Sequence, residues 1–265
     1  MTRLELMKRL YEIGAIKFGE FTLKSGKKSP YYIDLRILPS YPTVLKEVGK
    51  VMGEMITSLP EKPTRLCGIP AAGLAIATVV GIETEIPVCY TRKEPIVYKD
   101  LATQLRKSLS EEKTKLINAV KGQTHVDEYI EAFFKGFERT IEKIDELSGL
   151  KTHGITRYVD GDIQDGDKIG IIDDLITTAE SKLEARDLIK LEAKRRNINV
   201  DVVGVYVLLD REQGGREALQ REGLQLHSVL NITECAKWLY QSGVLSPREY
   251  KVIIDYVTSE KQLIK

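Results

Sequence analysis

Residues 168–182 constrain the fold of this 265-residue chain more than any other stretch. They open with residues 169–172, a short apolar run rich in β-branched side chains, which is typical of a strand buried on both faces of a parallel sheet. Two adjacent carboxylates, Asp173 and Asp174, follow where this strand is expected to leave the sheet. A short polar turn then leads into a helix that the apolar periodicity predicts over 180–196. The stretch therefore predicts a strand, a polar turn and a helix.

The polar turn combines groups that suit an anion with groups that suit a sugar. In open α/β sheets, ligands bind outside the carboxyl ends of the strands. The hydroxyls of Thr177, Thr178 and Ser181, with the unpaired amides of a helix start, suit a phosphate. The carboxylates of Asp173 and Asp174 accept hydrogen bonds from hydroxyls or bind a hard cation. The turn is a candidate ribose 5-phosphate site; the plainer interpretation is a strand end followed by a helix cap.

Composition excludes several functional classes. With 42% hydrophobic residues, 30% charged residues and a formal net charge of +1, the chain resembles an ordinary globular protein rather than one that binds nucleic acid or an acidic membrane surface. Cys67, Cys89 and Cys235 are far apart in apolar surroundings, which predicts buried reduced thiols rather than disulfides or a zinc site. We see neither a signal-peptide pattern nor an apolar run of membrane-spanning length, so we expect a cytoplasmic protein.

Other segments complete an alternation of strands and helices. The periodicities predict helices over 2–13, 43–59, 231–241 and 246–259, and strands over 65–69, 86–90, 200–210 and 224–230. Strands that alternate with helices favour an α/β fold with a mainly parallel central sheet, flanking helices and right-handed crossovers.

The segment 14–36 predicts a small hairpin near the N-terminus. Alternating apolar residues stand on both sides of a turn at Ser25-Gly26. One interpretation is a two-stranded decoration of the main sheet. The other is a lid in which Lys24 supplies a cation and the pair Tyr31 and Tyr32 supplies an aromatic face, as would suit a planar anionic base.

Three further strand or helix boundaries carry candidate binding groups. The small residues Ala71, Ala72 and Gly73 allow backbone amides to approach an anion, although they also suit tight helix–sheet packing. Arg92 and Lys93 follow the strand at 86–90, where they are placed to neutralise a pyrophosphate. Arg211 follows the strand at 200–210, where it can pair with a substrate carboxylate or belong to a surface turn.

These motifs carry a resemblance to a known family. Residues 21–36 look like the N-terminal hood of orotate phosphoribosyltransferases, and are especially similar to the same domain of bifunctional UMP synthases. Residues 169–181 resemble the phosphoribosyl-pyrophosphate (PRPP) signature of type I phosphoribosyltransferases, and residues 208–215 are again similar to the orotate enzymes. The resemblance implies the type I phosphoribosyltransferase fold in one domain over 1–265, with a hood at about 14–40.

The resemblance also implies the reaction and its residues. Orotate and PRPP would give orotidine 5′-monophosphate and pyrophosphate, a step of UMP biosynthesis, with Mg²⁺ held mainly through PRPP and the two aspartates as candidate neighbours of the ion. The PRPP-binding residues would be Ala71, Ala72, Gly73, Arg92, Lys93, Lys151, His153, Asp173, Asp174, Leu175, Ile176, Thr177, Thr178, Ala179, Glu180 and Ser181. The orotate-binding residues would be Lys24, Tyr31, Tyr32, Thr177 and Arg211. Lys93, Lys151, His153, Asp173 and Asp174 would be the catalytic residues, and the family implies a homodimer with its catalytic loop shared between subunits.

One long insertion interrupts the family pattern. In the family, the Arg-Lys-Glu segment leads directly into a flexible catalytic loop with a Lys and a His-Gly, which appear here only at Lys151 and His153. The intervening residues, about 95–150, are charged and show helical periodicity at Val126, Ile130, Phe133, Phe137, Ile141, Ile144 and Leu147. We expect a helical hairpin spliced into the catalytic loop. The sequence assigns it no function.

Two alternatives to an active enzyme of this kind stay open. Ala179 and Glu180 stand where such turns usually carry glycine or another small residue, which favours a PRPP-sensing regulatory protein with weak or no catalysis. The retained Lys151, His153 and Arg211 oppose that alternative. A purine phosphoribosyltransferase fits worse, because those enzymes lack the hood. A separate decarboxylase docking on the insertion has no support in the sequence.

Overall fold

The computed structural model describes residues 2–22, 26, 28–92, 108–111, 114–115, 130–131, 133–139 and 157–262. The chain divides into two compact units, one formed by residues 1–92 and 158–265 and the other by residues 93–157. In the first unit the elements are α1 (Arg3–Glu12), β1 (Ile16–Thr22), β2 (Lys28–Ile33), the 3-10 helix η1 (Leu35–Ser40), α2 (Pro42–Thr57), β3 (Arg65–Gly68), α3 (Ala72–Thr84), β4 (Val88–Thr91), β5 (Val159–Asp160), β6 (Asp167–Ile176), α6 (Glu180–Arg196), β7 (Val200–Asp210), α7 (Gly215–Arg221), β8 (Leu226–Asn231), α8 (Ile232–Gln241) and α9 (Pro247–Gln262).

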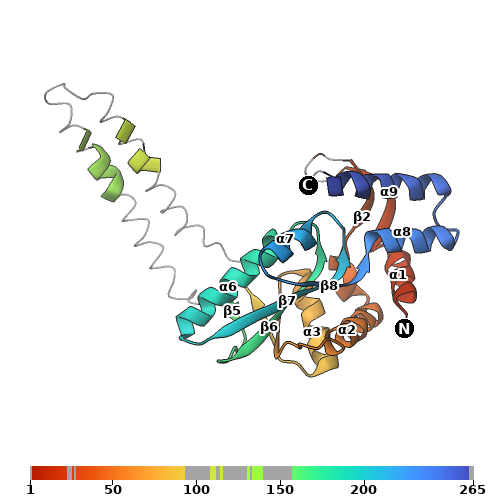
Figure 1. Cartoon of the computed structure of the whole chain (residues 1–265), viewed down its shortest axis with the longest axis horizontal. Coiled ribbons are helices and arrows are strands. Elements are labelled where there is room, and N and C mark those ends of the chain that lie inside the picture. The colour runs from red at the N-terminus through yellow and green to blue at the C-terminus, as the bar shows by residue number, and fades with distance from the viewer. Residues whose placement is uncertain are drawn as a thin grey trace. The chain divides into compact units, whose positions relative to one another are not determined.

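The first unit is built on a six-stranded sheet with the order β5-β4-β3-β6-β7-β8 (Figure 1). Every neighbouring pair in it is parallel except β4 and β5, which are antiparallel. The predicted α/β fold with a mainly parallel sheet is therefore confirmed. β6 lies between β3 and β7, so its carboxyl end lies in the middle of the edge where ligands bind in such sheets.

Alternate residues of the strands supply two hydrophobic cores. On β7, Val205 and Val207 pack with α6 and α7, whereas Tyr206 and Leu208 belong to the core shared with α1, α2, α3 and α8. Because side chains alternate across a strand, a central strand can be apolar on both faces only when helices cover both. The near-continuous apolar sequence of residues 200–210 follows from this arrangement.

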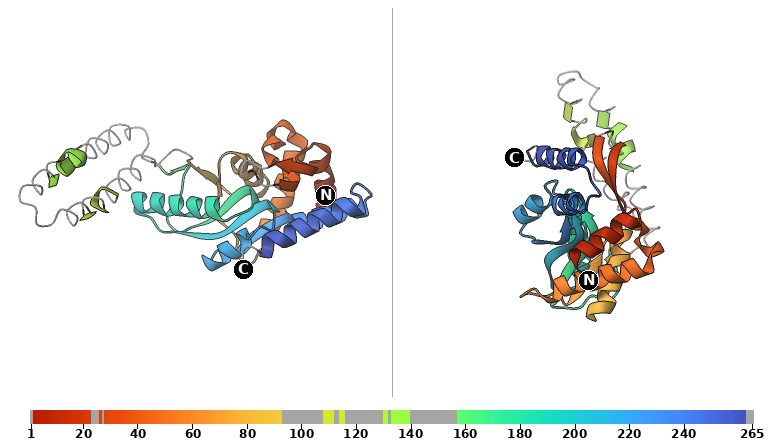
Figure 2. Two further views of the ribbon diagram at one scale, coloured as in Figure 1. Left: turned by 90° about the horizontal axis from the view of Figure 1, so that it is seen from above. Right: turned by 90° about the vertical axis from the view of Figure 1, so that its right-hand side faces the viewer.

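The predicted hairpin forms a separate two-stranded antiparallel sheet of β1 and β2. α9 lies alongside β2, as Figures 1 and 2 both show, and Tyr31 meets Tyr256 edge to face with ring centroids 5.7 Å apart. Such pairs add stability beyond the buried area of the rings. The C-terminal helix therefore supports the hairpin that carries Tyr31.

The second unit is described only in short helical segments, at 108–111, 114–115, 130–131 and 133–139. Within the last of these, Phe134 is buried, while Phe133 and Phe137 are exposed. The sequence pattern predicted that Phe133 and Phe137 lie on the apolar face of the helix that packs. The buried face of this helical segment therefore differs from the predicted one. Most of the predicted helical hairpin lies outside the described residues.

Candidate active site

The acidic pair lies inside the central strand rather than after it. β6 continues to Ile176 and pairs with β7 up to Ile176 and Asp210. The expected strand at residues 169–172 was therefore too short at its carboxyl end. Asp173 is only 7% exposed, and Asp174 is half-buried. Charges this deep need partners, because removing a carboxylate from water is costly.

Asp173 forms an ion pair with Lys182, the third residue of α6. The Lys182 Nζ lies 2.7 Å from Asp173 Oδ2, and both side chains are nearly excluded from solvent. The same Nζ donates to the carbonyl oxygen of Leu175 at 2.7 Å and to Ser181 Oγ at 3.2 Å. Sequence reasoning missed Lys182. The available signal was its place on the buried stripe of the helix, one turn before Ala185 and two before Ile189.

The carboxylate of Asp174 has weaker partners than that of Asp173 to offset the cost of its burial. Its Oδ1 accepts a hydrogen bond from the amide nitrogen of Leu175 at 2.7 Å. Burial, followed by the charge of the neighbouring Asp173, raises the pKa of Asp174 to about 7. The two carboxylates thus differ, since one is paired with an ammonium and the other is poised to bind or release a proton near neutral pH.

The small-residue segment lies directly against this pair. α3 begins at Ala72, and its first turn approaches β6 so closely that a Cβ added to Gly73 would lie 2.7 Å from the carbonyl oxygen of Ile172 and 2.9 Å from Asp173 Oδ1. Only glycine fits at this distance. The structure therefore places Gly73 against Asp173, while the role of residues 71–73 toward an anion stays a prediction.

The turn that follows β6 presents a helix start to solvent. Thr177 is half-buried, Ala179 is buried, and Thr178, Glu180 and Ser181 are exposed. α6 begins at Glu180, as predicted, and Ala179 at its N-cap makes no side-chain capping bond. The first amides of a helix lack partners within the helix and attract anions. The turn thus retains the donors expected of a phosphate site.

Arg211 lies next to this turn, although it comes from the end of β7. Its amide nitrogen donates to the carbonyl oxygen of Ile176 at 3.0 Å. Its guanidinium lies over the ring of Tyr31, 5.2 Å from the centroid, and its Nε is buried without a hydrogen-bond partner among the described residues. An arginine with an unused buried donor is suited to an anionic ligand.

The two tyrosines expected to face orotate differ in exposure. Tyr32 is 37% exposed, whereas Tyr31 is fully buried, and burial raises the pKa of the Tyr31 hydroxyl to about 12. Tyr31 therefore packs its ring against the Arg211 guanidinium, and only the ring of Tyr32 is exposed to solvent. Their roles toward orotate stay predictions. Lys24 lies outside the described residues.

Arg92 marks the point where the chain leaves the sheet for the second unit. Its Nε lies 2.9 Å from Asp160 Oδ2, and its amide nitrogen donates to the carbonyl oxygen of Tyr158 at 3.0 Å. Within the first unit, the chain therefore leaves the sheet at Arg92 and re-enters at Tyr158 beside it, at the β4–β5 pair. Lys93, Lys151 and His153 lie outside the described residues, so their predicted roles stay predictions.

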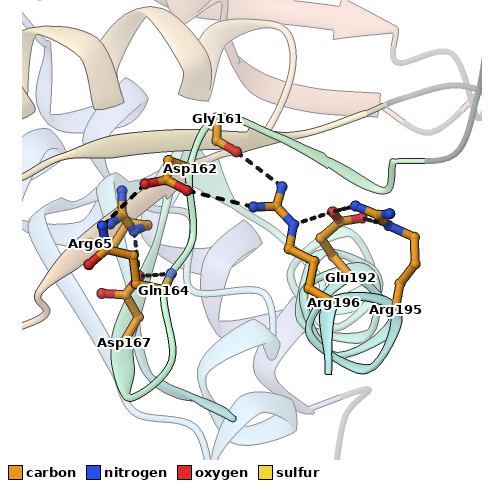
Figure 3. A network of polar contacts seen from close by, with 8 residues as sticks. All are labelled: Arg65, Gly161, Asp162, Gln164, Asp167, Glu192, Arg195 and Arg196. Atoms are coloured by element: carbon orange, nitrogen blue, oxygen red, sulfur yellow. Dashed lines mark hydrogen bonds and ion pairs between the residues drawn. The ribbon is translucent and has the colours of Figure 1, made fainter. Parts of the chain in front are cut away.

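A buried carboxylate on α6 anchors the returning end (Figure 3). Glu192 accepts a hydrogen bond from the amide nitrogen of Tyr158 at 2.8 Å. It also accepts hydrogen bonds from Arg195 Nη2 and Arg196 Nε, each at 2.6 Å, and Figure 3 draws these two contacts. Burial alone would raise the pKa of Glu192, but the two arginines and the amide outweigh it and lower the pKa to about 2. Arg196 Nη2 also donates to the carbonyl oxygen of Gly161 at 3.2 Å. Sequence reasoning did not single out this network.

All three cysteines are buried and free, as predicted. Among the described residues, no helix is both long and apolar enough to cross a membrane.

Curated proteins similar to this chain include a uridine 5′-monophosphate synthase and orotate phosphoribosyltransferases. Uridine 5′-monophosphate synthase of Bos taurus is 28% identical over 228 residues, which is 86% of this chain but only 35% of that protein. Orotate phosphoribosyltransferase of Staphylothermus marinus is 28% identical over 257 residues, 97% of this chain and 95% of that protein. No family profile matches the chain.

Solved structures agree on the fold. UMP synthase of Leishmania donovani superposes with a TM-score of 0.67 at 24% identity, over 98% of this chain and 43% of that one. Orotate phosphoribosyltransferase of Mycobacterium tuberculosis in complex with PRPP superposes with a TM-score of 0.52 at 18% identity, over 88% of this chain and 98% of that one. The chain has the fold of the type I phosphoribosyltransferases.

Proposed function

We propose that this chain is an orotate phosphoribosyltransferase, which converts orotate and PRPP into orotidine 5′-monophosphate and pyrophosphate. The relatives named for this activity and the shared fold support the proposal. The observation that carries it is the backbone hydrogen bond from the Arg211 amide to the carbonyl oxygen of Ile176, at 3.0 Å. It holds the residue proposed to bind orotate beside the start of the turn proposed to bind the ribose 5-phosphate, as a transfer between the two substrates requires.

The reaction breaks the C1′–O bond to pyrophosphate as the orotate ring nitrogen bonds to C1′. The ribose gains positive character in the transition state, as in glycoside cleavage. The ring nitrogen of orotate is already acidic, so positioning and charge neutralisation matter more than a strong base.

Each substrate group has a proposed partner. The amides and hydroxyls of residues 177–181 hold the 5-phosphate, while Asp173 and Asp174 accept hydrogen bonds from the ribose hydroxyls. Arg92 neutralises the pyrophosphate together with residues 71–73. The PRPP bound to the Mycobacterium tuberculosis enzyme supports PRPP as the donor.

Mg²⁺ fits this arrangement as a substrate-borne ion. Asp173 is already paired with Lys182 at 2.7 Å, so we propose that the ion is held mainly through PRPP oxygens, with Asp174 nearby. When bound, the ion would neutralise charge on the departing pyrophosphate. We further propose a cytoplasmic homodimer in which Lys93, Lys151 and His153 close over the pyrophosphate of the neighbouring subunit.

The test is orotate consumption in the presence of PRPP and Mg²⁺, followed by ultraviolet absorbance. The intact chain should turn over, and Lys151→Ala should lose most of that activity. Lys190→Ala serves as the matched control, because Lys190 is exposed on α6. Loss of activity in the Lys151 variant alone would place Lys151 in the catalytic loop despite the insertion.

A second candidate is a PRPP-sensing regulatory protein on the same fold. It is favoured by Glu180, an exposed carboxylate at the start of α6, where it lies beside the proposed phosphate site. PRPP binding without any orotate turnover would support this candidate and contradict the enzyme.

A further inference from the structure

Lys182 is a buried cation that the reaction described above does not use. It is 4% exposed, and its ammonium group contacts residues on both sides of the turn that carries the proposed phosphate site. Its three acceptors are Asp173 Oδ2, the carbonyl oxygen of Leu175 and Ser181 Oγ, at 2.7, 2.7 and 3.2 Å. An ammonium has three N–H donors, so this set accounts for all of them.

We propose that Lys182 is a positioning residue that couples the ribose subsite to the 5-phosphate subsite of PRPP. This inference rests on the proposed function. Lys182 contacts one residue from each subsite, since Asp173 belongs to the ribose side and Ser181 to the phosphate side. A single ammonium therefore fixes both groups relative to each other before PRPP binds, which lowers the ordering cost of binding.

The effect on Ser181 follows from hydrogen-bond direction. Ser181 Oγ accepts a hydrogen bond from Lys182 Nζ, so its own O–H must point away from the ammonium. Ser181 is exposed at the start of α6, on the side where the amides of the turn are available. Its hydroxyl is thereby oriented as a donor, which is the role that a phosphate oxygen needs.

The effect on Asp173 is electrostatic. An unpaired carboxylate beside a phosphate dianion would weaken phosphate binding, because like charges repel strongly where water is scarce. The ion pair at 2.7 Å offsets the charge of Asp173, whose other oxygen, Oδ1, accepts a hydrogen bond from the amide nitrogen of Asp174 at 2.9 Å. Lys182 thus allows carboxylates and a phosphate to share one turn.

The experiment uses two fragments of PRPP as probes, ribose 5-phosphate and inorganic pyrophosphate, with binding measured by calorimetry on the intact chain and variants. Lys182→Met should weaken ribose 5-phosphate binding at least about tenfold, as expected for loss of a charge-assisted contact, and leave pyrophosphate binding unchanged. Lys182→Arg should recover part of the loss because it restores the cation. Lys190→Met, an exposed substitution on the same helix, should bind both probes like the intact chain.

A double variant tests whether Lys182 acts through Ser181. Ser181→Ala should weaken ribose 5-phosphate binding, and adding Lys182→Met should cost less than the sum of the two single changes. Equal ribose 5-phosphate binding by the intact chain and Ser181→Ala would overturn the proposal. Because Ser181 is exposed, Ser181→Ala should fold, so it tests the proposal even if Lys182→Met does not fold. Equal loss of both probes in Lys182→Met would also overturn it. Failure of the intact chain to bind either probe would instead contradict the proposed function.

Discussion

The amide nitrogen of Tyr158 donates a 2.8 Å hydrogen bond to the carboxylate of Glu192, whose side chain is completely buried. Tyr158 is where the chain returns from the second unit, and Glu192 lies in the last turns of α6 (Figure 3). The same helix begins at the proposed phosphate turn. The helix α6 therefore begins at the proposed phosphate turn and, near its end, binds Tyr158, where the chain re-enters the first unit.

Replacing Glu192 by Gln should destabilise the protein by about 2 kcal/mol at pH 7, because Arg195 and Arg196 lose a buried charged acceptor. The folded-state pKa of about 2 lies below the ordinary value of 4.5. The stabilisation is therefore complete above about pH 4.5 and is lost as the pH falls through 4.5 toward 2. Urea unfolding of both proteins between pH 7 and pH 2.5 measures this difference.

The control for this prediction is Glu222→Gln. Glu222 pairs with Arg186 at 2.9 Å, but its side chain is 49% exposed, and exposed pairs contribute little. Its effect should stay within about 0.5 kcal/mol at every pH. An equal effect of the two substitutions would contradict the anchoring role of Glu192.

Removal of the insertion should leave the first unit folded. The amide nitrogen of Arg92 and the carbonyl oxygen of Tyr158 are 3.0 Å apart, so a short linker can connect these two residues of the first unit. In the test variant, one residue replaces residues 95–150. Its circular dichroism should remain that of an α/β protein, and its Tm should lie within a few degrees of the Tm of the first unit in the intact chain. Loss of cooperative melting in this variant would mean that the insertion supports the sheet.

Asp174→Asn should stabilise the unliganded protein at pH 8 and abolish turnover. Burial raises the pKa of Asp174 from 3.8 to about 7, so the folded state holds this proton more tightly than the unfolded chain does. Stability is therefore lost as the pH rises from about 4 to 7, and the neutral Asn avoids that loss. We expect a gain of about 1–2 kcal/mol at pH 8 and almost none at pH 4.

The neighbouring substitution gives the opposite result. Asp173→Asn leaves the buried ammonium of Lys182 without its carboxylate, so it should destabilise the protein by about 3 kcal/mol at pH 8. Denaturant unfolding of the two variants in parallel tests the difference. If both lower the stability equally, the two carboxylates are not distinguished by Lys182.

Arg211→Met should raise the KM for orotate at least about tenfold and leave the KM for PRPP nearly unchanged, because it removes a charged partner of the orotate carboxylate. Tyr31→Phe keeps the ring under Arg211 and removes a hydroxyl that is buried without a hydrogen-bond partner among the described residues. It should change neither KM, and it should change the stability by less than about 1 kcal/mol. Steady-state kinetics with each substrate varied separately distinguishes the two roles.

The sequence predicted the elements whose apolar patterns are long. The strand at 200–210 and the helix at 180–196 have the predicted bounds, because both bury continuous stripes. The predicted strand was shorter than β6. Two adjacent aspartates indicate the end of a strand unless a buried cation is known to balance the charge of one of them. α7, which begins at Gly215, was not predicted, because Gly214 and Gly215 indicate a turn more strongly than seven residues indicate a helix.

The candidate site was predicted where each motif lies in one short segment. Residues 71–73, the turn after β6 and Arg211 all lie at the same edge of the sheet, as the topology requires. Lys182 and Glu192 were missed, because a charged residue within a helix usually indicates the solvated face. Their partners come from other elements, and such contacts between distant segments are not visible in local patterns.

Gly73→Ala tests how closely α3 must approach β6. The added Cβ would lie 2.7 Å from the carbonyl oxygen of Ile172 and 2.9 Å from the Asp173 Cα, both backbone atoms that cannot rotate away. α3 must therefore shift, which should cost about 1–3 kcal/mol of stability and raise the KM for PRPP. Gly136→Ala is the control, because no atom of the described residues lies within 4 Å of its added Cβ and alanine favours a helix. An unchanged KM for PRPP in Gly73→Ala would mean that the first turn of α3 does not contribute to the PRPP site. A raised KM for PRPP with little change in kcat would mean that this turn is part of the PRPP site.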